Sequence, residues 1–260
     1  MNTVAIIQAR ISSMRLPGKV LIDICGKPML WYVVKRTKWA KHINKVVVAT
    51  STESFDNPIV DFCKKYKIGY FRGDLEDVLS RYYHCARKYK ADVIVRVTAD
   101  CPLIDGTLID RGLATLRKSK TDYLSNTVVR TFPRGFDFEI FKFSALNKAY
   151  RNTKEDPEKE HVTPYIWRNH PEKFKIGQLK RRGDKSGYRI TVDTWEDFKV
   201  VKELIEKFSA HEKNAEEIIE ILDKHPELVK INKNIDQKHY GQYNNARKEI
   251  GKKCLETKTS

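Results

Sequence analysis

Three cationic side chains, Arg10, Arg15 and Lys19, lie close together near the start of the chain. They follow an apolar run at residues 4–7 that is typical of a buried strand. Two serines and a Pro-Gly pair in the same segment indicate a turn-bounded loop. Arginine offers a planar fork of donors and lysine a point charge, and both bind phosphate oxygens. Because an open α/β sheet binds ligands beyond the carboxyl ends of its strands, this loop predicts a polyphosphate site.

The loop contains neither of the common glycine-rich phosphate motifs. The Gly-x-x-x-x-Gly-Lys-Ser/Thr spacing is absent, and so is Gly-x-Gly-x-x-Gly. We therefore expect side-chain cations, more than a glycine backbone, to hold a nucleotide. The alternative interpretation is that the three charges are ordinary solvated loop residues.

Two aspartates follow other predicted strands. Asp100 comes directly after the apolar run at 93–97, and Asp193 ends the extended segment at 187–192. Magnesium typically takes only one or two protein carboxylates and fills its remaining positions with water and phosphate oxygens. The pair therefore predicts a Mg²⁺ site, with the alternative that Asp100 caps a turn or the next helix. Thr194 and Asp197 are interpreted as the N-cap and acidic first turn of a helix.

A cationic loop and two carboxylates together suit metal-assisted nucleotidyl transfer. Such chemistry depends on positioning and charge stabilisation, so it does not need a protein nucleophile. It does require the first and fourth strands to be neighbours, because only then does Asp100 lie beside the loop.

The first half of the chain alternates short apolar runs with amphipathic stretches, which predicts a parallel sheet covered by helices on both faces. Strands are expected at 4–9, 45–50, 68–72 and 93–97, and helices at 28–38, 57–66, 76–89 and 105–116. Asp105 is the expected N-cap of the last of these helices.

The second half departs from this alternation and predicts a continuation of the sheet with an excursion that shapes a substrate pocket. Extended segments are expected at 122–125, 136–143, 173–180 and 187–192, and helices at 158–167, 196–208 and 215–223. Residues 1–229 are predicted to form one catalytic domain. Residues 230–260 hold eight Lys or Arg and three Asp or Glu, a net +5, and are predicted to be a basic polar extension.

The composition favours an anionic partner. The 260 residues carry a formal charge of +16, but the basic residues are spread along the chain without a compact patch interleaved with aromatics, so nucleic acid is not the expected partner.

No apolar stretch reaches the length of a membrane helix, and residues 1–3 run directly into the first strand without a signal-peptide pattern. The five cysteines form no Cys-x-x-Cys pair. We expect a cytoplasmic protein with no membrane insertion.

The order of motifs resembles the sugar-acid cytidylyltransferases, which include the CMP-Kdo and CMP-acylneuraminate synthetases, and is closest to the spore-coat polysaccharide type. The resemblance spans roughly residues 3–205 and begins with Ile-Gln-Ala-Arg-Ile-Ser-Ser-Met-Arg-Leu-Pro-Gly-Lys at 7–19. The supporting stretches are residues 26–30, 47–51, 71–83, 98–105, 132–139, 160–166 and 191–197.

This resemblance implies a nucleotide-diphospho-sugar transferase fold, a Rossmann-like mixed and mostly parallel sheet between helices. It implies that Arg10, Arg15 and Lys19 hold the triphosphate of CTP and that Asp100 and Asp193 are the Mg²⁺ ligands, these five forming the catalytic set. By the same matching, the residues near the nucleotide also include Gln8, Ala9, Ser12, Ser13, Arg81 and Thr98. A homodimer is expected on the same ground.

The expected acceptor is a sugar acid. CMP-Kdo synthetases usually read Gln-Gly-Asp-Glu-Pro where this chain has Thr-Ala-Asp-Cys-Pro at 98–102, which argues against Kdo itself. Arg134 is predicted to bind the acceptor carboxylate, Asp137 and Glu139 its hydroxyls from one strand face, and His161 to act as a polar ligand or proton carrier. The alternatives are a strand face paired with lysines for Asp137 and Glu139, and a satisfied helix histidine for His161.

The predicted reaction is attack of a sugar-acid hydroxyl on the α-phosphate of CTP with release of pyrophosphate, in surface polysaccharide or glycoconjugate biosynthesis. One alternative is the same fold acting on another phosphorylated or polyol acceptor. Another is a non-catalytic nucleotide or RNA binder. A glycosyltransferase is less favoured, because no Asp-x-Asp metal motif stands in a suitable place.

Overall fold

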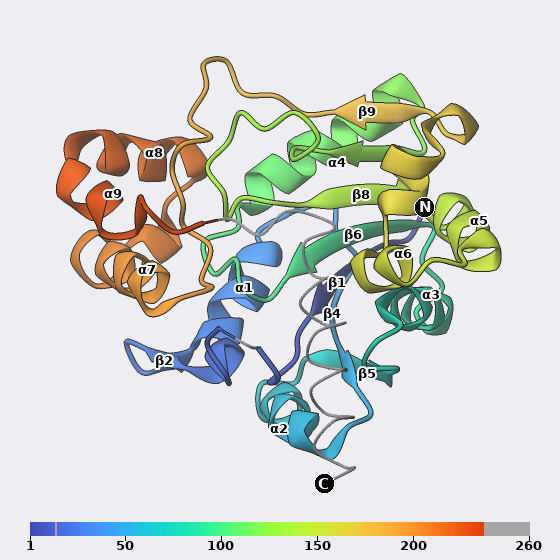
Figure 1. The fold of residues 1–260 in the computed structure, drawn as a ribbon, viewed down its shortest axis with the longest axis horizontal. Coiled ribbons are helices and arrows are strands. Elements are labelled where there is room, and N and C mark those ends of the chain that lie inside the picture. The colour runs from blue at the N-terminus through green and yellow to red at the C-terminus, as the bar shows by residue number, and fades with distance from the viewer. Residues whose placement is uncertain (14, 237–260) are drawn as a thin grey trace, which may run out of the picture.

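The computed structural model describes residues 1–13 and 15–236. It contains a seven-stranded sheet with helices on both faces (Figure 1). The strand order is β5-β4-β1-β6-β8-β7-β9, and β8 runs antiparallel to both of its neighbours. The strands are β1 (Thr3–Gln8), β4 (Lys45–Ser51), β5 (Gly69–Gly73), β6 (Val93–Thr98), β7 (Tyr123–Ser125), β8 (Glu139–Lys142) and β9 (Ile176–Gln178). This arrangement confirms the mixed, mostly parallel sheet.

Helices α7, α8 and α9 lie on the left of Figure 1, and α3, α5 and α6 lie on the right. Their bounds are α1 (Met29–Thr37), α2 (Asn57–Lys65), α3 (Val78–Lys88), α4 (Gly106–Ser119), α5 (Phe143–Asn152), α6 (Asp156–His161), α7 (Trp195–Phe208), α8 (Ala215–Lys224) and α9 (Pro226–Asn232). A small hairpin of β2 (Asp23–Ile24) and β3 (Lys27–Pro28) precedes α1. Within the described ranges, no helix is both long and apolar enough to cross a membrane.

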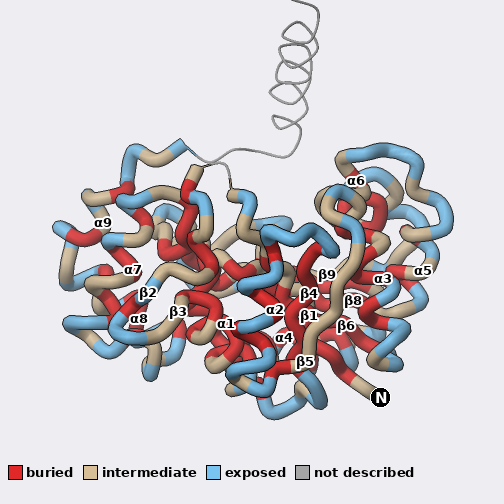
Figure 2. The backbone as a smooth tube through the Cα atoms, turned by 90° about the horizontal axis from the view of Figure 1, so that it is seen from below, coloured by how far each residue is buried: buried red, intermediate tan, exposed pale blue. Residues whose placement is uncertain are grey.

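Two apolar cores lie on opposite faces of the sheet. Ala5 and Ile7 of β1 point into the core shared with α1, α2, α4, α7 and α8, whereas Val4 and Ile6 point into the core shared with α3 and α5. This alternation explains why β1 reads as a continuous apolar run, because both of its faces are covered. Figure 2 shows the buried residues concentrated along the central strands and on the inner sides of the helices.

The first half of the chain agrees with the sequence prediction to within one or two residues at most element ends. The side chain of Asp105 accepts a hydrogen bond from the backbone N–H of Thr107 at 2.7 Å, as expected of the N-cap of α4. Thr194 and Asp197 form a reciprocal capping box at the start of α7. Strands β1 and β6 are neighbours, with Gln8 paired to Thr98.

Several predictions in the second half were wrong in detail. The strand predicted at 173–180 covers only Ile176–Gln178 and is preceded by a 3₁₀ turn at Pro171–Lys173. The strand predicted at 136–143 covers only Glu139–Lys142 and gives way to helix α5, which was not predicted. The helix predicted at 158–167 is interrupted after α6, where Val162 has a positive φ of 72° and Pro164 removes a backbone donor; a π-helical turn follows at Tyr165–Asn169.

The segment predicted as a strand at 187–192 does not join the sheet. Its backbone instead bonds to loops: the Ile190 N–H donates to Arg134 O at 2.7 Å and the Val192 N–H to Asp100 O at 2.8 Å. Helix α9 crosses the predicted domain boundary between residues 229 and 230. Most of the predicted basic extension, from residue 237 onward, lies outside the described residues.

Candidate active site

A pocket of about 270 Å³ opens at the carboxyl ends of the neighbouring strands β1 and β6. Its walls come from the loop after β1, the loop after β6, helices α3 and α6, and the segment before α7. The lining residues are Gln8, Ala9, Arg10, Ser13, Arg15, Lys19, Val20, Val78, Arg81, Arg96, Thr98, Ala99, Asp100, Glu160, His161 and Asp193. Every residue predicted to bind nucleotide is among them except Ser12, which is exposed.

Lys19 lies between the two predicted metal ligands. Its Nζ is 2.8 Å from Asp193 Oδ1 and 3.5 Å from Asp100 Oδ2. Burial alone would lower the pKa of Lys19, but the negative charges of Asp100 and Asp193 outweigh burial and raise the pKa above its ordinary value. The structure therefore brings residues from three distant parts of the sequence to one charged centre.

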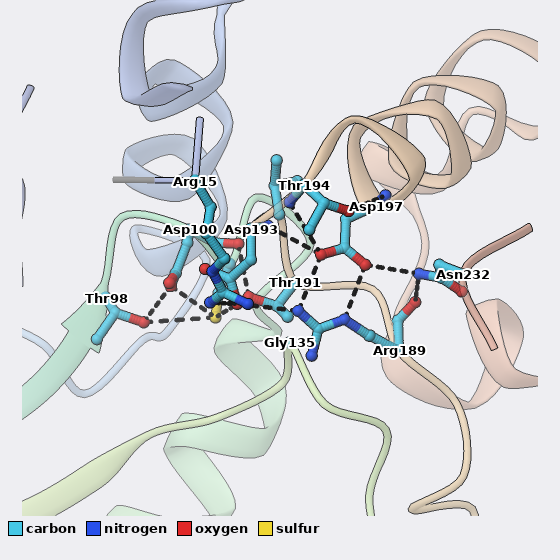
Figure 3. A network of polar contacts seen from close by, with 12 residues as sticks. Arg15, Thr98, Asp100, Gly135, Arg189, Thr191, Asp193, Thr194, Asp197 and Asn232 are labelled. Carbon is cyan, nitrogen blue, oxygen red and sulfur yellow. Dashed lines mark hydrogen bonds and ion pairs between the residues drawn. The ribbon is translucent and has the colours of Figure 1, made fainter. Parts of the chain in front are cut away.

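Asp193 is held by three cations. Arg15 and Arg189 each place a guanidinium nitrogen 2.9 Å from Asp193 Oδ2, on the opposite oxygen from Lys19 (Figure 3). Burial by itself would raise the pKa of Asp193, but these cations overcome it and hold the pKa below its ordinary value. The carboxylate is thus kept ionised in a half-enclosed site.

Asp100 is oriented by neighbours from its own loop. The Thr98 hydroxyl donates to Asp100 Oδ1 at 2.5 Å, and the Cys101 thiol donates to the same oxygen at 3.4 Å (Figure 3). Burial and the adjacent Asp100 charge raise the pKa of Cys101, so the thiol stays protonated and can donate. The second oxygen, Oδ2, is left facing Lys19.

The two carboxylates fit a hard divalent cation held jointly with phosphate. Asp193 Oδ1 and Asp100 Oδ2 both face the Lys19 ammonium nitrogen. The two carboxylate oxygens therefore converge on one point and favour a positive charge there. No cluster of three or more His, Cys, Asp or Glu side chains suited to a metal occurs in the described residues. Mg²⁺, which often uses few carboxylates and keeps waters and phosphate oxygens, suits such a sparse donor set.

Asp56, which the sequence analysis did not single out, anchors the cationic loop. Its Oδ1 accepts from the Ile11 backbone N–H at 2.7 Å, and its Oδ2 accepts from the Ser51 hydroxyl at 2.5 Å. Asp56 is fully buried and therefore ties the loop after β1 to the end of β4. An acid six residues after a predicted strand gives no strong sequence signal of such a role.

Arg81 of α3 has unsatisfied donors in the pocket wall. It is 2% exposed, and its Nε and Nη1 have no hydrogen-bond partner among the residues that the structure describes. Burial lowers the pKa of Arg81, and the positive charge of Arg10 lowers it further. Because buried guanidinium donors are normally paired, this arrangement favours an anionic ligand.

Arg96 is a pocket residue that sequence reasoning missed. Its Nε donates to Gln8 Oε1 at 3.1 Å, and its Nη1 forms an ion pair with Glu139. Since arginine has only donors, this contact orients the Gln8 amide oxygen toward Arg96. The sequence does contain a signal for a functional or structural role of Arg96. This residue interrupts the apolar run of a strand expected to be buried on both faces, where a charged side chain needs a partner.

Glu139 lies behind the pocket and does not line it. Its carboxylate accepts from Tyr123 Oη at 2.6 Å and Thr163 Oγ1 at 2.5 Å, in addition to pairing with Arg96. Asp137 lies outside β8, so the two acids do not share a strand face, and it makes a bidentate pair with Arg130 at 2.5 and 2.9 Å.

The other two predicted acceptor residues are placed differently from one another. His161, the last residue of α6, lines the pocket, and burial lowers the pKa of its imidazole. Arg134 does not line the pocket; it forms an isolated parallel bridge with Arg189, on the segment that leads to Asp193.

Gly135 lets the Arg134 loop approach this segment closely. Its φ is +113°, and a Cβ there would lie 2.6 Å from Ile190 C and 2.7 Å from Thr191 N. We expect Gly135→Ala to lower the free energy of unfolding by about 3 kcal/mol, from backbone strain plus a backbone clash. Urea unfolding measures this, with Gly187→Ala as the control because nothing lies within 4 Å of its added Cβ. Equal urea midpoints for the two variants would show that the close approach of Gly135 to Ile190 and Thr191 does not require glycine.

Comparisons with known proteins agree with this geometry. A family model described as Cytidylyltransferase matches residues 4–249. The chain is 40% identical over 242 residues to an uncharacterized protein of Methanocaldococcus jannaschii, covering 92% of this chain and 98% of that one. It is 34% identical over 232 residues to the spore coat polysaccharide biosynthesis protein SpsF of Bacillus subtilis, covering 86% and 95%.

Solved structures extend the likeness to three dimensions. A cytidylyltransferase from Leptospira borgpetersenii superposes with a TM-score of 0.84 at 35% identity, covering 92% of this chain and 100% of that chain. The CMP:2-keto-3-deoxy-manno-octonic acid synthetase in complex with CTP superposes with a TM-score of 0.62 at 19% identity, covering 80% and 100%, and shows the shared fold. The nucleotide-diphospho-sugar transferase fold predicted from the motifs is confirmed. On the family match and these identities, the chain belongs to the cytidylyltransferase family.

Proposed function

We propose that this cytidylyltransferase uses CTP and Mg²⁺ to activate a sugar acid as a CMP-sugar, releasing pyrophosphate, for surface polysaccharide or glycoconjugate biosynthesis. The observation that carries the proposal is the position of Lys19, between Asp100 and Asp193 and within a pocket lined by four arginines. A pocket that combines a cationic wall with two convergent carboxylates suits a metal-bound triphosphate better than a simple anion, which would be repelled by the acids.

The cations would hold the triphosphate. Arg10, Arg15 and Lys19 come from one loop, and Arg81 faces them from α3, so the polyphosphate would be gripped from two sides. Mg²⁺ bound by Asp100 and Asp193 would offset phosphate charge and favour in-line displacement at the α-phosphorus. Leaving pyrophosphate would remain paired with the same cations, which lowers the barrier because charge accumulates where donors are already placed.

The acceptor would approach along the α6 side of the pocket. His161 lines that side, and we retain it as the ligand for a sugar hydroxyl. Arg134 remains the proposed partner of the acceptor carboxylate, since it sits on the loop that contacts the segment before Asp193. Because Glu139 is fully engaged by Arg96, Tyr123 and Thr163, we propose that it positions Arg96 and Gln8 instead of binding sugar.

Arg81→Met tests the nucleotide side of the proposal. Loss of a charge-assisted hydrogen bond should weaken CTP binding about 10- to 100-fold, measured by calorimetry. The variant should be at least as stable as the wild type, because a buried charge with unsatisfied donors is removed. Arg87→Met on the exposed side of the same helix is the matched control. Wild-type CTP affinity in Arg81→Met would remove this residue from the nucleotide site.

A pyrophosphate-release screen tests the whole proposal. The wild-type enzyme would be assayed with CTP, UTP, GTP and ATP against keto-sugar acids, the corresponding neutral sugars, polyols and sugar phosphates, with and without EDTA. We expect release only with CTP, a sugar acid and Mg²⁺. Release with a polyol or phosphorylated acceptor but no sugar acid would instead favour the same chemistry on a different substrate class.

A further inference from the structure

Arg189 connects the predicted metal ligand Asp193 to a second, deeper carboxylate. Its Nη2 is 2.9 Å from Asp193 Oδ2 and 2.8 Å from Asp197 Oδ2, and its Nε is 2.7 Å from Asp197 Oδ1. The planar guanidinium therefore spans both acids at once, which a lysine ammonium could not do with the same fixed geometry. Figure 3 shows Arg189 between the two carboxylates.

Asp197 is the fixed point of this arrangement. It is fully buried, and its Oδ2 accepts from the backbone N–H of Asp193 at 2.9 Å and of Thr194 at 3.2 Å. Asp197 thus holds Asp193 twice, through the backbone directly and through the side chain by way of Arg189. These contacts orient a carboxylate that is itself at the pocket edge.

Asn232, the last residue of α9, completes the arrangement from the far end of the described chain. Its Nδ2 donates to Asp197 Oδ1 at 2.9 Å and to the backbone oxygen of Arg189 at 3.0 Å (Figure 3). The side chain is buried, and α9 packs against α7, whose first turn contains Asp197. Asn232 lies outside the pocket lining, so it cannot touch a ligand there.

The two oxygens of Asp193 consequently face different partners. Oδ2 is turned toward Arg189 and Arg15, whereas Oδ1 is turned toward Lys19 and, across it, Asp100 Oδ2. Arg15 and Lys19 belong to the loop proposed to bind triphosphate. Arg189 contacts Asp197 and Asn232 and belongs to a different segment from that loop, so its contact with Asp193 Oδ2 leaves Oδ1 directed at Lys19 and Asp100.

We propose that Asn232, Asp197 and Arg189 form a positioning chain through which helix α9 fixes Asp193 for divalent-cation binding. The proposal rests on the function proposed above, in which Asp100 and Asp193 hold Mg²⁺. Hydrogen-bonding partners behind metal ligands typically contribute 10- to 100-fold to metal affinity, because they set ligand orientation. Asn232 is therefore a positioning residue of the metal site, although 39 positions separate it from Asp193 in the sequence.

Binding of Mn²⁺ alone to the full-length protein, followed by electron paramagnetic resonance, tests the chain. We expect Asn232→Ala to raise the Mn²⁺ dissociation constant about tenfold. Arg189→Lys, which keeps the charge but cannot span both carboxylates, should give a similar increase. Lys230→Ala, an exposed substitution on the same helix, should bind Mn²⁺ as the wild type does.

A second readout separates positioning from a purely structural role. CTP affinity measured in EDTA should change less than twofold in Asn232→Ala, because the cationic loop is untouched. A lower melting temperature with unchanged Mn²⁺ affinity would overturn the positioning chain and leave the proposed function standing. If Asn232→Ala does not fold, wild-type Mn²⁺ affinity in Arg189→Lys overturns it equally. If the wild type binds no Mn²⁺, either alone or with CTP present, the proposed metal site is overturned and the positioning chain with it.

Discussion

Replacing Lys19 with alanine should lower kcat about a hundred- to a thousandfold while the protein stays folded. The ammonium is the cation that contacts both carboxylates, and it would act on charge that develops as pyrophosphate leaves. Removing one preorganised donor of this kind typically costs 10²- to 10³-fold, about 3–4 kcal/mol of barrier. Asp193 keeps Arg15 and Arg189 as partners in the variant, so the fold should tolerate the change.

Steady-state pyrophosphate release gives kcat, and a thermal melt checks the fold. Lys38→Ala is the control, because Lys38 is exposed and lies just after α1, away from the pocket. A Lys19→Ala enzyme that turns over at nearly the wild-type rate would exclude the cationic loop from the mechanism.

Replacing Asp100 with asparagine should lower activity about a thousandfold or more. The activity that remains should no longer depend on Mg²⁺. The change preserves shape and the hydrogen bond that Thr98 donates, but it removes the negative charge from the oxygen that faces Lys19. A metal ion contributes several kcal/mol of transition-state stabilisation, and each 1.36 kcal/mol is a factor of ten in rate.

Activity would be measured across a Mg²⁺ titration at saturating CTP, beside Asp61→Asn, an exposed aspartate of α2, as the matched control. Chelation of the wild type should reproduce the Asn phenotype. Full metal-dependent activity in Asp100→Asn would show that another group holds the cation.

The charged centre is assembled from parts of the chain that fold around different elements. The loop after β1 supplies Lys19, the loop after β6 supplies Asp100, and the segment before α7 supplies Asp193. Three acids behind the pocket each contact a pocket residue, its loop or an arginine that pairs with it: Asp56, Glu139 and Asp197. Buried carboxylates that accept several bonds in this way restrict rotamers and backbone, which nucleotidyl transfer requires because it depends on alignment.

The sequence by itself determined the alternating first half, the cationic loop, and Asp100 and Asp193 as the candidate acids. These features are local: an apolar run covered on both faces and a proline or capping residue at a helix start are decided within a few positions. The same locality explains the errors. Residues 187–192 have the composition of a strand, yet their hydrogen bonds go to Arg134 and Asp100, which lie far away in the sequence.

Only the tertiary structure decided which charged and polar side chains meet. Lys19 and Asp193 are 174 positions apart, Arg96 and Glu139 are 43 apart, and Asp197 and Asn232 are 35 apart. Composition marks each of these residues as polar but does not identify its partner, because the pairing energy exists only once the fold has brought the strands together and packed α9 against α7.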